Sequence, residues 1–318
     1  MFAQSSVTLG GTYNFGFQKA DNGAQKADFF DAKINFSGKE DLGGGLTAAF
    51  FTEIQVGGRQ DTSTNTVTSA NSSKDSGVWG RNATLSLTGG FGSVTGGRVE
   101  SSNYNQKAQL AGASLNDGFD KNKIAGAVSN YNMVGYVTPA MNGFTANVAV
   151  LKALNSDFAP SATTASAELS VTAVGVDYAA GPLAAGFVNK KVDKAGSTAD
   201  DGTKNEAYVT YDLGMAKVGY GYGKNSGARY AGQAATNVYS VSVPMGALTV
   251  GADYIRRGVG GSGTAADSNG LTAASKGYAV AANYALSKRT KINATVGKLT
   301  QGGTAGANQY RVGLFHNF

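Results

Sequence analysis

The sequence predicts an all-β protein: one transmembrane, antiparallel β-barrel of about 16 strands, each near the roughly 10 residues that a tilted spanning strand needs. Three observations lead to this fold class. Apolar and polar residues alternate with a period of two along most of the chain. The connections between the alternating stretches are short and long in turn. Aromatic side chains gather near both ends of the expected strands, as they do at the two interfaces of a membrane.

The composition supports this class and excludes several functions. The 318 residues include 46 glycines, one histidine and no cysteine, and only 15% are charged. Without cysteine there is no disulfide, no thiol catalysis and no thiolate metal site. The single histidine, His316, leaves little room for a histidine-dependent hydrolase or a multi-histidine metal site. We therefore expect no catalytic, cofactor or metal site, and hence no enzyme.

The first strand carries the clearest alternation. Between Val7 and Phe17 the odd positions are mostly apolar, and the even positions are glycine, threonine or asparagine. A strand of this kind has one apolar and one polar face. The same texture recurs near residues 30–37, 46–55, 82–88, 144–150, 174–178, 207–211, 218–222, 248–254, 278–284, 292–296 and 310–318, and more weakly near 93–99, 128–137, 184–191 and 237–243.

The connections separate into two length classes. Short turns are expected near 40–45, 89–92, 139–143, 180–182, 213–215, 244–246 and 286–290. Long polar loops are expected near 18–28, 56–77, 99–127, 153–166, 191–204, 224–236, 257–276 and 298–308. A soluble β-sandwich has no reason to segregate its loops in this way, whereas outer-membrane barrels have short periplasmic turns and long external loops.

A sheet in lipid has to close, because every backbone amide must find a partner. About 16 strands enclose a lumen too wide for side chains to fill, so a water-filled channel is expected. The net charge of +6 comes without a dense basic block or a nucleic-acid motif, so no nucleic-acid partner is expected.

Several blocks of sequence resemble the trimeric general porins of Gram-negative outer membranes, of the neisserial and burkholderial type. The blocks are residues 5–9, 33–46, 81–87, 90–98, 287–290 and 312–318. The resemblance extends over the whole chain as one domain, 1–318, although strand texture alone supports it between about 150 and 275.

This resemblance implies a homotrimer of 16-stranded barrels whose third long loop, about 100–127, folds into the lumen and narrows it. Constrictions in the family oppose basic residues on the wall to acidic residues on this loop. A basic residue that is usual in the sixth strand is replaced here by Gly135. The matching positions are Lys33 and Arg81 on the wall and Glu100, Asp117 and Asp120 on the loop, with Lys121 or Lys123 in place of the missing cation.

Strand parity separates the two wall cations. Lys33 falls on the polar face of its strand, where it should point into water. Arg81 shares the parity of the apolar Ala83 and Leu85, so it faces the lumen only if a bulge near Gly80 redirects it; otherwise it lies at the rim. Gly219, Gly221 and Gly223 alternate with tyrosines, and we expect them to let aromatic side chains pack on the opposite face of a bent strand.

The expected function is passive diffusion of ions and small hydrophilic solutes, with weak to moderate anion preference. The alternative is a substrate-selective channel for small organic anions or sugars. Expected partners are two further copies of the chain, outer-membrane lipid, and the solutes and ions themselves. The start Met1-Phe2-Ala3-Gln4 contains no signal peptide. We expect that a signal was removed after Ala3 and that Met1 was added for expression; the alternative is a native cytosolic start.

Overall fold

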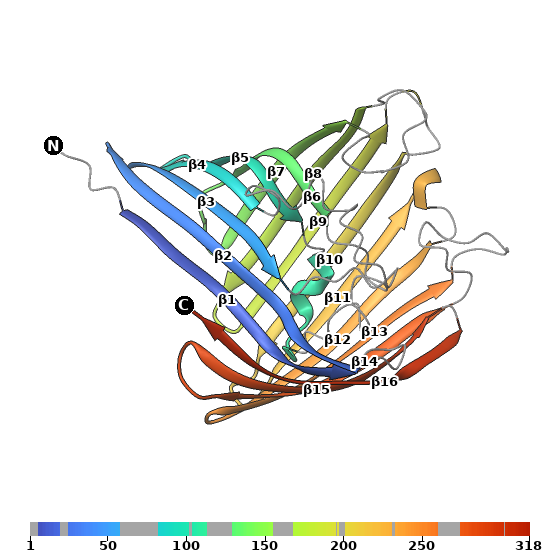
Figure 1. The fold of residues 1–318 in the computed structure, drawn as a ribbon. Helices are drawn as coiled ribbons and strands as arrows, with labels where there is room; N and C mark the ends of the chain where they lie inside the picture. The colour runs from blue at the N-terminus through green and yellow to red at the C-terminus, as the bar shows by residue number, and fades with distance from the viewer. Residues whose placement is uncertain are drawn as a thin grey trace.

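The computed structural model describes residues 6–19, 25–57, 82–101, 104–112, 129–154, 168–194, 196, 201–230, 233–259, 274–301 and 303–318. Within these residues, sixteen antiparallel strands form a closed barrel (Figure 1). Every strand pairs with its neighbours in the chain, and β1 closes the sheet against β16. The predicted fold class is confirmed.

The elements follow one another without a crossover. The strands are β1 (Ser6–Lys19), β2 (Gln25–Gly43), β3 (Leu46–Gly57), β4 (Asn82–Gly89), β5 (Gly92–Ser101), β6 (Ser129–Val137), β7 (Phe144–Leu154), β8 (Glu168–Ala180), β9 (Leu183–Lys194), β10 (Gly202–Asp212), β11 (Lys217–Ser226), β12 (Gln233–Met245), β13 (Leu248–Val259), β14 (Ser275–Ala285), β15 (Thr290–Gln301) and β16 (Thr304–Asn317). Two short 3₁₀ helices are η2 (Tyr104–Ala108) and η5 (Ala228–Tyr230). Neither helix in the described ranges has the length and apolar character that a membrane crossing requires.

The seam between β1 and β16 shows how the alternating sequence is used. On the outer face, Phe15 pairs with Leu314, and both side chains are exposed. On the inner face, Gln18 pairs with Arg311, and both are buried. Cross-strand partners share one face of a sheet, so the pattern continues around the barrel. The apolar face therefore points outward, as it does in a barrel surrounded by lipid.

The short turns lie where the sequence predicts them. The turn between β2 and β3 is an example: Gly43, Gly44 and Gly45 all have positive φ, between 62° and 81°. Glycine adopts this conformation without the steric penalty of a side chain. The Asp41 carboxylate accepts a hydrogen bond of 2.9 Å from the Gly43 N–H, which stabilises the turn.

Four of the predicted long loops are shorter than expected. The loop expected at 298–308 is mostly strand, because β15 extends to Gln301 and pairs there with Thr304 at the start of β16. The predicted loops 18–28, 191–204 and 224–236 are likewise shortened, because β1, β2, β9, β10, β11 and β12 extend into them. These strand ends are rich in polar residues and glycine. The period-two signal is then lost, and the sequence of such a hairpin cannot be told from that of a loop.

Candidate functional site

Residues 104–112 lie inside the barrel, and we refer to them as the luminal segment. They begin with η2, which Figure 1 shows within the ring of strands. The helix contacts β9, β10, β11 and β12. The segment then continues across the inner wall until Gly112 contacts Asn283 of β14. One continuous piece of chain is therefore laid against about half of the barrel wall.

The inner face of β11 receives the backbone of this segment through a row of glycines. A Cβ atom on Gly219 or Gly221 would collide with the carbonyl oxygen of Ala108 or Asn105, respectively. One on Gly223 would lie 2.8 Å from the side-chain amide of Asn105. Aromatic packing on the opposite face is present, since the Tyr220 and Tyr239 rings are 5.3 Å apart there, but the sequence did not reveal what occupies the inner face. The glycines are required because another backbone approaches the strand closely.

Acidic and hydroxyl side chains of the wall accept hydrogen bonds from the end of the luminal segment. Leu110 donates its N–H to Ser240 Oγ at 2.8 Å and to Asp253 Oδ1 at 3.3 Å. Ala111 donates to the same carboxylate oxygen at 3.3 Å. The Ser240 hydroxyl also donates to Asp253 Oδ1, at 2.5 Å. The buried Asp253 carboxylate therefore stabilises this end of the segment by accepting its backbone N–H groups.

Amides and an apolar cluster complete the attachment. Asn283 donates to the carbonyl oxygen of Ala111 at 3.2 Å, and Asn293 donates to that of Gly112 at 3.5 Å. Ala108 of η2 is fully buried in a luminal cluster. The cluster also contains Val238, Ile255 and Leu299, with Tyr208 packed against it. The luminal segment covers these side chains and keeps them from water. This explains why the inner face of the barrel carries apolar residues at these positions.

A second group of polar side chains surrounds Asp177 of β8. Tyr104 donates its hydroxyl to Asp177 Oδ2 at 2.6 Å, and Tyr208 donates to Oδ1 at 3.0 Å. Lys107 Nζ lies 3.0 Å from Oδ1, and Asn147 Nδ2 lies 3.3 Å from Oδ2. Burial raises the pKa of the Tyr104 hydroxyl above its usual range, and the hydrogen bond to Asp177 raises that pKa further. The phenol therefore stays protonated and keeps donating.

Glu206 of β10 holds the start of the segment. Its side chain is only 3% exposed and accepts a hydrogen bond of 3.0 Å from the Tyr104 N–H. Lys190 of β9 forms an ion pair with the same carboxylate, at 3.2 Å. Three luminal carboxylates, those of Asp177, Glu206 and Asp253, are therefore all bound by the segment or by a lysine beside it.

Of the residues expected at the constriction, the structure places Lys33. It pairs with Thr12 of β1 and with Gln55 of β3. Thr12 pairs in turn with Asn317 of β16, in the row of inner-face residues. Lys33 therefore lies on the inner face, as its parity predicts. In the closed ring β2 is eight strands from β10 in either direction, so Lys33 lies across the lumen from η2, the start of the luminal segment.

The other expected constriction residues are not placed. Arg81, Asp117, Asp120, Lys121 and Lys123 lie outside the described residues, and Glu100 belongs to β5 with a side chain outside them. Gly135 lies on the inner face, paired with Thr95 and Ala149. Asp177 and Asp253 alternate with apolar residues along their strands, but nothing in the sequence indicates their role as anchors. The run Gly219, Gly221 and Gly223 was the one available signal of a docking surface.

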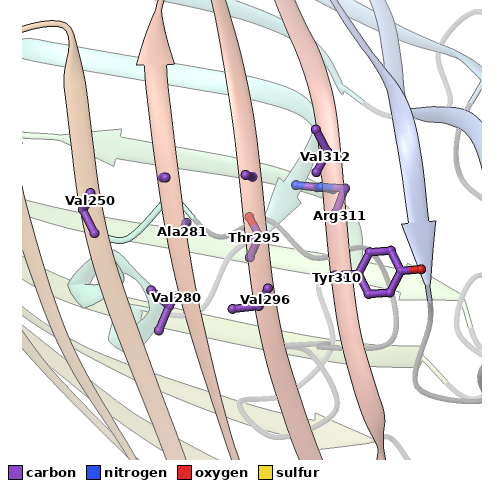
Figure 2. Close-up of a pocket in the computed structure, with 10 residues that line it drawn as sticks. Val250, Val280, Ala281, Thr295, Val296, Tyr310, Arg311 and Val312 are labelled. Carbon is purple, nitrogen blue, oxygen red and sulfur yellow. The ribbon is translucent and has the colours of Figure 1, made fainter.

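A shallow apolar hollow lies on the outer wall and not in the lumen. Figure 2 shows Val280 and Val296 on β14 and β15, beside Tyr310 on β16. The hollow arises because Ala282 and Ala294 are paired across β14 and β15, and their small side chains leave space. Because the hollow is on the face of the sheet that points away from the lumen, it is not part of the candidate site.

Comparison with known proteins agrees with this architecture. The profile of the family described as Gram-negative porin matches residues 1–304. The chain belongs to this family. Membership places it in the outer membrane of a Gram-negative bacterium, and the family and the fold indicate a channel rather than an enzyme.

Two neisserial outer-membrane proteins match a little under half of the chain. The chain is 29% identical to major outer membrane protein P.IB of Neisseria lactamica, over 46% of this chain and 44% of that protein. It is 30% identical to P.IB of Neisseria meningitidis serogroup B, with the same coverage. The aligned part of the chain thus spans less than half the length of these relatives.

Solved structures are similar over nearly their whole length. An anion-selective porin from Comamonas acidovorans has a TM-score of 0.66 at 23% identity, covering 99% of this chain and 100% of that one. A mutant of the Rh. blastica porin has a TM-score of 0.65 at 14% identity, covering 98% and 100%. At these identities the similarity establishes the fold.

Proposed function

We propose that the chain forms a passive, water-filled channel through which ions and small hydrophilic solutes diffuse, with a weak to moderate preference for anions. The closed barrel with its polar inner face supports the channel. The luminal segment is the described part of the loop expected to constrict it, and its docked position supports that role. Size exclusion and the field across the lumen then select what passes.

One observation supports the anion preference above all: the luminal carboxylates beside the segment are already bound. Asp177 is paired with Lys107, and Glu206 is paired with Lys190. Asp253 accepts backbone N–H groups and a hydroxyl. A carboxylate whose charge is compensated at about 3 Å contributes little field farther into the lumen.

The opposite wall contributes a cation. Lys33 lies on the inner face of β2, facing the side on which the acids are compensated. In a narrow aqueous pore with low-dielectric walls, fixed charges act more strongly than in bulk water and are screened over about 8 Å at physiological salt. Glu53 of β3 lies on the same inner face and accepts a hydrogen bond from Asn82. We propose that the balance of these charges favours anions. Acids of the loop outside the described residues, Asp117 and Asp120, oppose it and limit the selectivity.

Reconstitution tests the channel itself. Purified protein added to a planar bilayer should give stepwise conductance, and proteoliposomes should swell at rates that fall with the size of a neutral solute. A folded, heat-modifiable barrel that gives neither response would contradict the proposal.

The alternative, a channel selective for organic anions or sugars, requires a transport rate that saturates as the solute concentration rises. Passive diffusion requires a transport rate that increases linearly with solute concentration.

We further propose a homotrimer. The outer face of β1 exposes Val7 and Leu9, and that of β16 exposes Val312 and Leu314. Val312 and Leu314 pair with Phe17 and Phe15 across the closing seam, and Val7 and Leu9 lie nearer the start of β1. Together these outward apolar side chains suit a dry contact between barrels. We also propose that the long polar loop expected near 56–77, which lies largely outside the described residues, latches over the neighbouring subunit.

A further inference from the structure

The group around Asp177 has the composition of a site for an ammonium ion. Lys107 Nζ lies 3.7 Å from the centroid of the Tyr104 ring and 5.1 Å from that of the Tyr208 ring. The same nitrogen is 3.0 Å from Asp177 Oδ1. Aromatic faces attract a cation through their quadrupole, and a carboxylate supplies a charged hydrogen-bond acceptor. The ammonium group is thus held by two kinds of interaction at once.

The walls of this site do not depend on Lys107. Tyr104 and Tyr208 each donate a hydroxyl to Asp177, and their rings meet edge to face at a centroid distance of 6.0 Å. Asn147 donates to Asp177 Oδ2 and to the Tyr104 hydroxyl. The N–H of Tyr104 is bound separately by Glu206. Removing the lysine side chain therefore leaves the two rings and the carboxylate in position.

The site opens to the lumen. The Lys107 side chain is 39% exposed and that of Asp177 is 23% exposed, although both belong to a network of hydrogen bonds. Lys107 lies on the luminal segment, and Asp177 lies on the inner face of β8, paired with Gly186 of β9. A small solute that enters the lumen can therefore reach the position of the ammonium group.

We propose that Tyr104, Tyr208 and Asp177 form an alkylammonium-binding cage, that the ammonium of Lys107 is its resident ligand, and that this occupancy denies the cage to diffusing cations. Lys107 is then a residue that determines specificity: with it, the cage is electrically compensated, and without it, a carboxylate and two ring faces attract cations. The inference rests on the proposed channel function only for its effect on transport, since binding to the cage is a separate property.

A purely structural role is the competing explanation. Lys107 could simply fasten the luminal segment to β8. In that case its removal would loosen the segment, and no added ligand would restore what was lost. Chemical rescue separates the two explanations. Lys107→Ala retains Cβ, and n-propylammonium supplies three carbons and a nitrogen in place of the Cγ, Cδ, Cε and Nζ atoms that the alanine lacks.

The experiment measures n-propylammonium binding to detergent-solubilised protein by calorimetry, together with the reversal potential in a planar bilayer. Four proteins are compared: wild type, Lys107→Ala, Lys107→Met and Lys107→Ala/Asp177→Asn. Lys107→Met is the matched control, because its uncharged side chain fills the cage. n-Propanol is the uncharged control ligand. The ultraviolet titration of the tyrosines reports in each variant whether Tyr104 is still buried against Asp177.

Lys107→Ala should bind n-propylammonium, and this ligand, but not n-propanol or an equal concentration of sodium, should return its reversal potential toward that of wild type. Binding should be about tenfold weaker or more in Lys107→Met, whose methionine fills the cage, and in the double variant, which lacks the carboxylate. Equal binding to wild type and Lys107→Ala would overturn the proposal, as would no binding to Lys107→Ala while Tyr104 remains buried. If neither wild type nor any variant conducts ions, the proposed channel function is wrong. The calorimetry still decides whether the cage binds n-propylammonium.

Discussion

A single methyl group at Gly221 tests whether the inner face of β11 holds the luminal segment. In Gly221→Ala the new Cβ would collide with the carbonyl oxygen of Asn105 and lie 2.9 Å from its carbonyl carbon and 3.0 Å from its Cα. These are backbone atoms, which no change of rotamer can move. Either the whole of η2 or β11 must shift, and β11 is fixed by pairing with β10 and β12. We expect η2 to move away from the wall.

Overpacking of this kind costs about 1–3 kcal/mol. Each backbone hydrogen bond lost with the displacement, such as those to Asp253, adds a net cost of about 0.5–1.5 kcal/mol. Since about 1.4 kcal/mol is a factor of ten, the docked population should fall by roughly one to two orders of magnitude relative to the undocked one. The barrel itself should keep its melting temperature, because no strand pairing is removed.

Single-channel recording reads out the result. Gly221→Ala should show more open-channel noise and additional conductance levels, and the double variant Gly219→Ala/Gly221→Ala should show them more strongly. Gly96→Ala is the matched control, since a Cβ on that strand glycine meets nothing nearer than 4.0 Å. If the double variant gave the same conductance and noise as wild type and Gly96→Ala, our account of how the segment is held would be refuted.

Three further predictions follow. Replacing both Lys33 and Arg81 by alanine should move the reversal potential in a KCl gradient toward cation preference, with a shift that shrinks as salt rises; Lys288→Ala, in an exposed turn, is the control, and an unchanged double variant would exclude these two residues from the filter. Deleting residues 60–75 should lower the melting temperature of the oligomer in detergent, and unchanged oligomer stability would rule out the latch. The raised pKa of Tyr104 means that its contribution to docking is complete below about pH 10, the usual tyrosine value, and is lost only as the pH rises through the higher folded-state pKa. The ultraviolet difference between wild type and Tyr104→Phe should therefore appear only at the alkaline end of the titration, and a midpoint near pH 10 would contradict the burial.

The sequence determines the barrel well because the signal is local. Phe15 and Gln18 show which face each strand turns outward, and short turns such as 43–45 mark one end of the barrel. The same parity placed Lys33 on the inner face. The hairpin joined at Gln301 and Thr304 was missed, because the polar residues and glycines near its tip show no alternation to detect.

The anchors of the luminal segment could not be predicted in the same way. Asp177 and Asp253 are 76 positions apart, and their common role exists only because one loop crosses the wall between them. Parity indicates that such a side chain faces the lumen but not what it binds there. The backbone docked on Gly221 was missed because a strand glycine has the same sequence signature whether it accommodates a neighbouring side chain or another backbone.

The reversal potential of the wild-type channel in a planar bilayer with a KCl gradient tests the central claim most directly. The ion pairs of Asp177 and Glu206, together with Lys33 on the inner face of β2, predict a potential of the sign that indicates chloride preference, decreasing toward zero as the total salt concentration is raised. A channel that prefers potassium at low salt would contradict the claim that lysines compensate the charges of these two luminal acids.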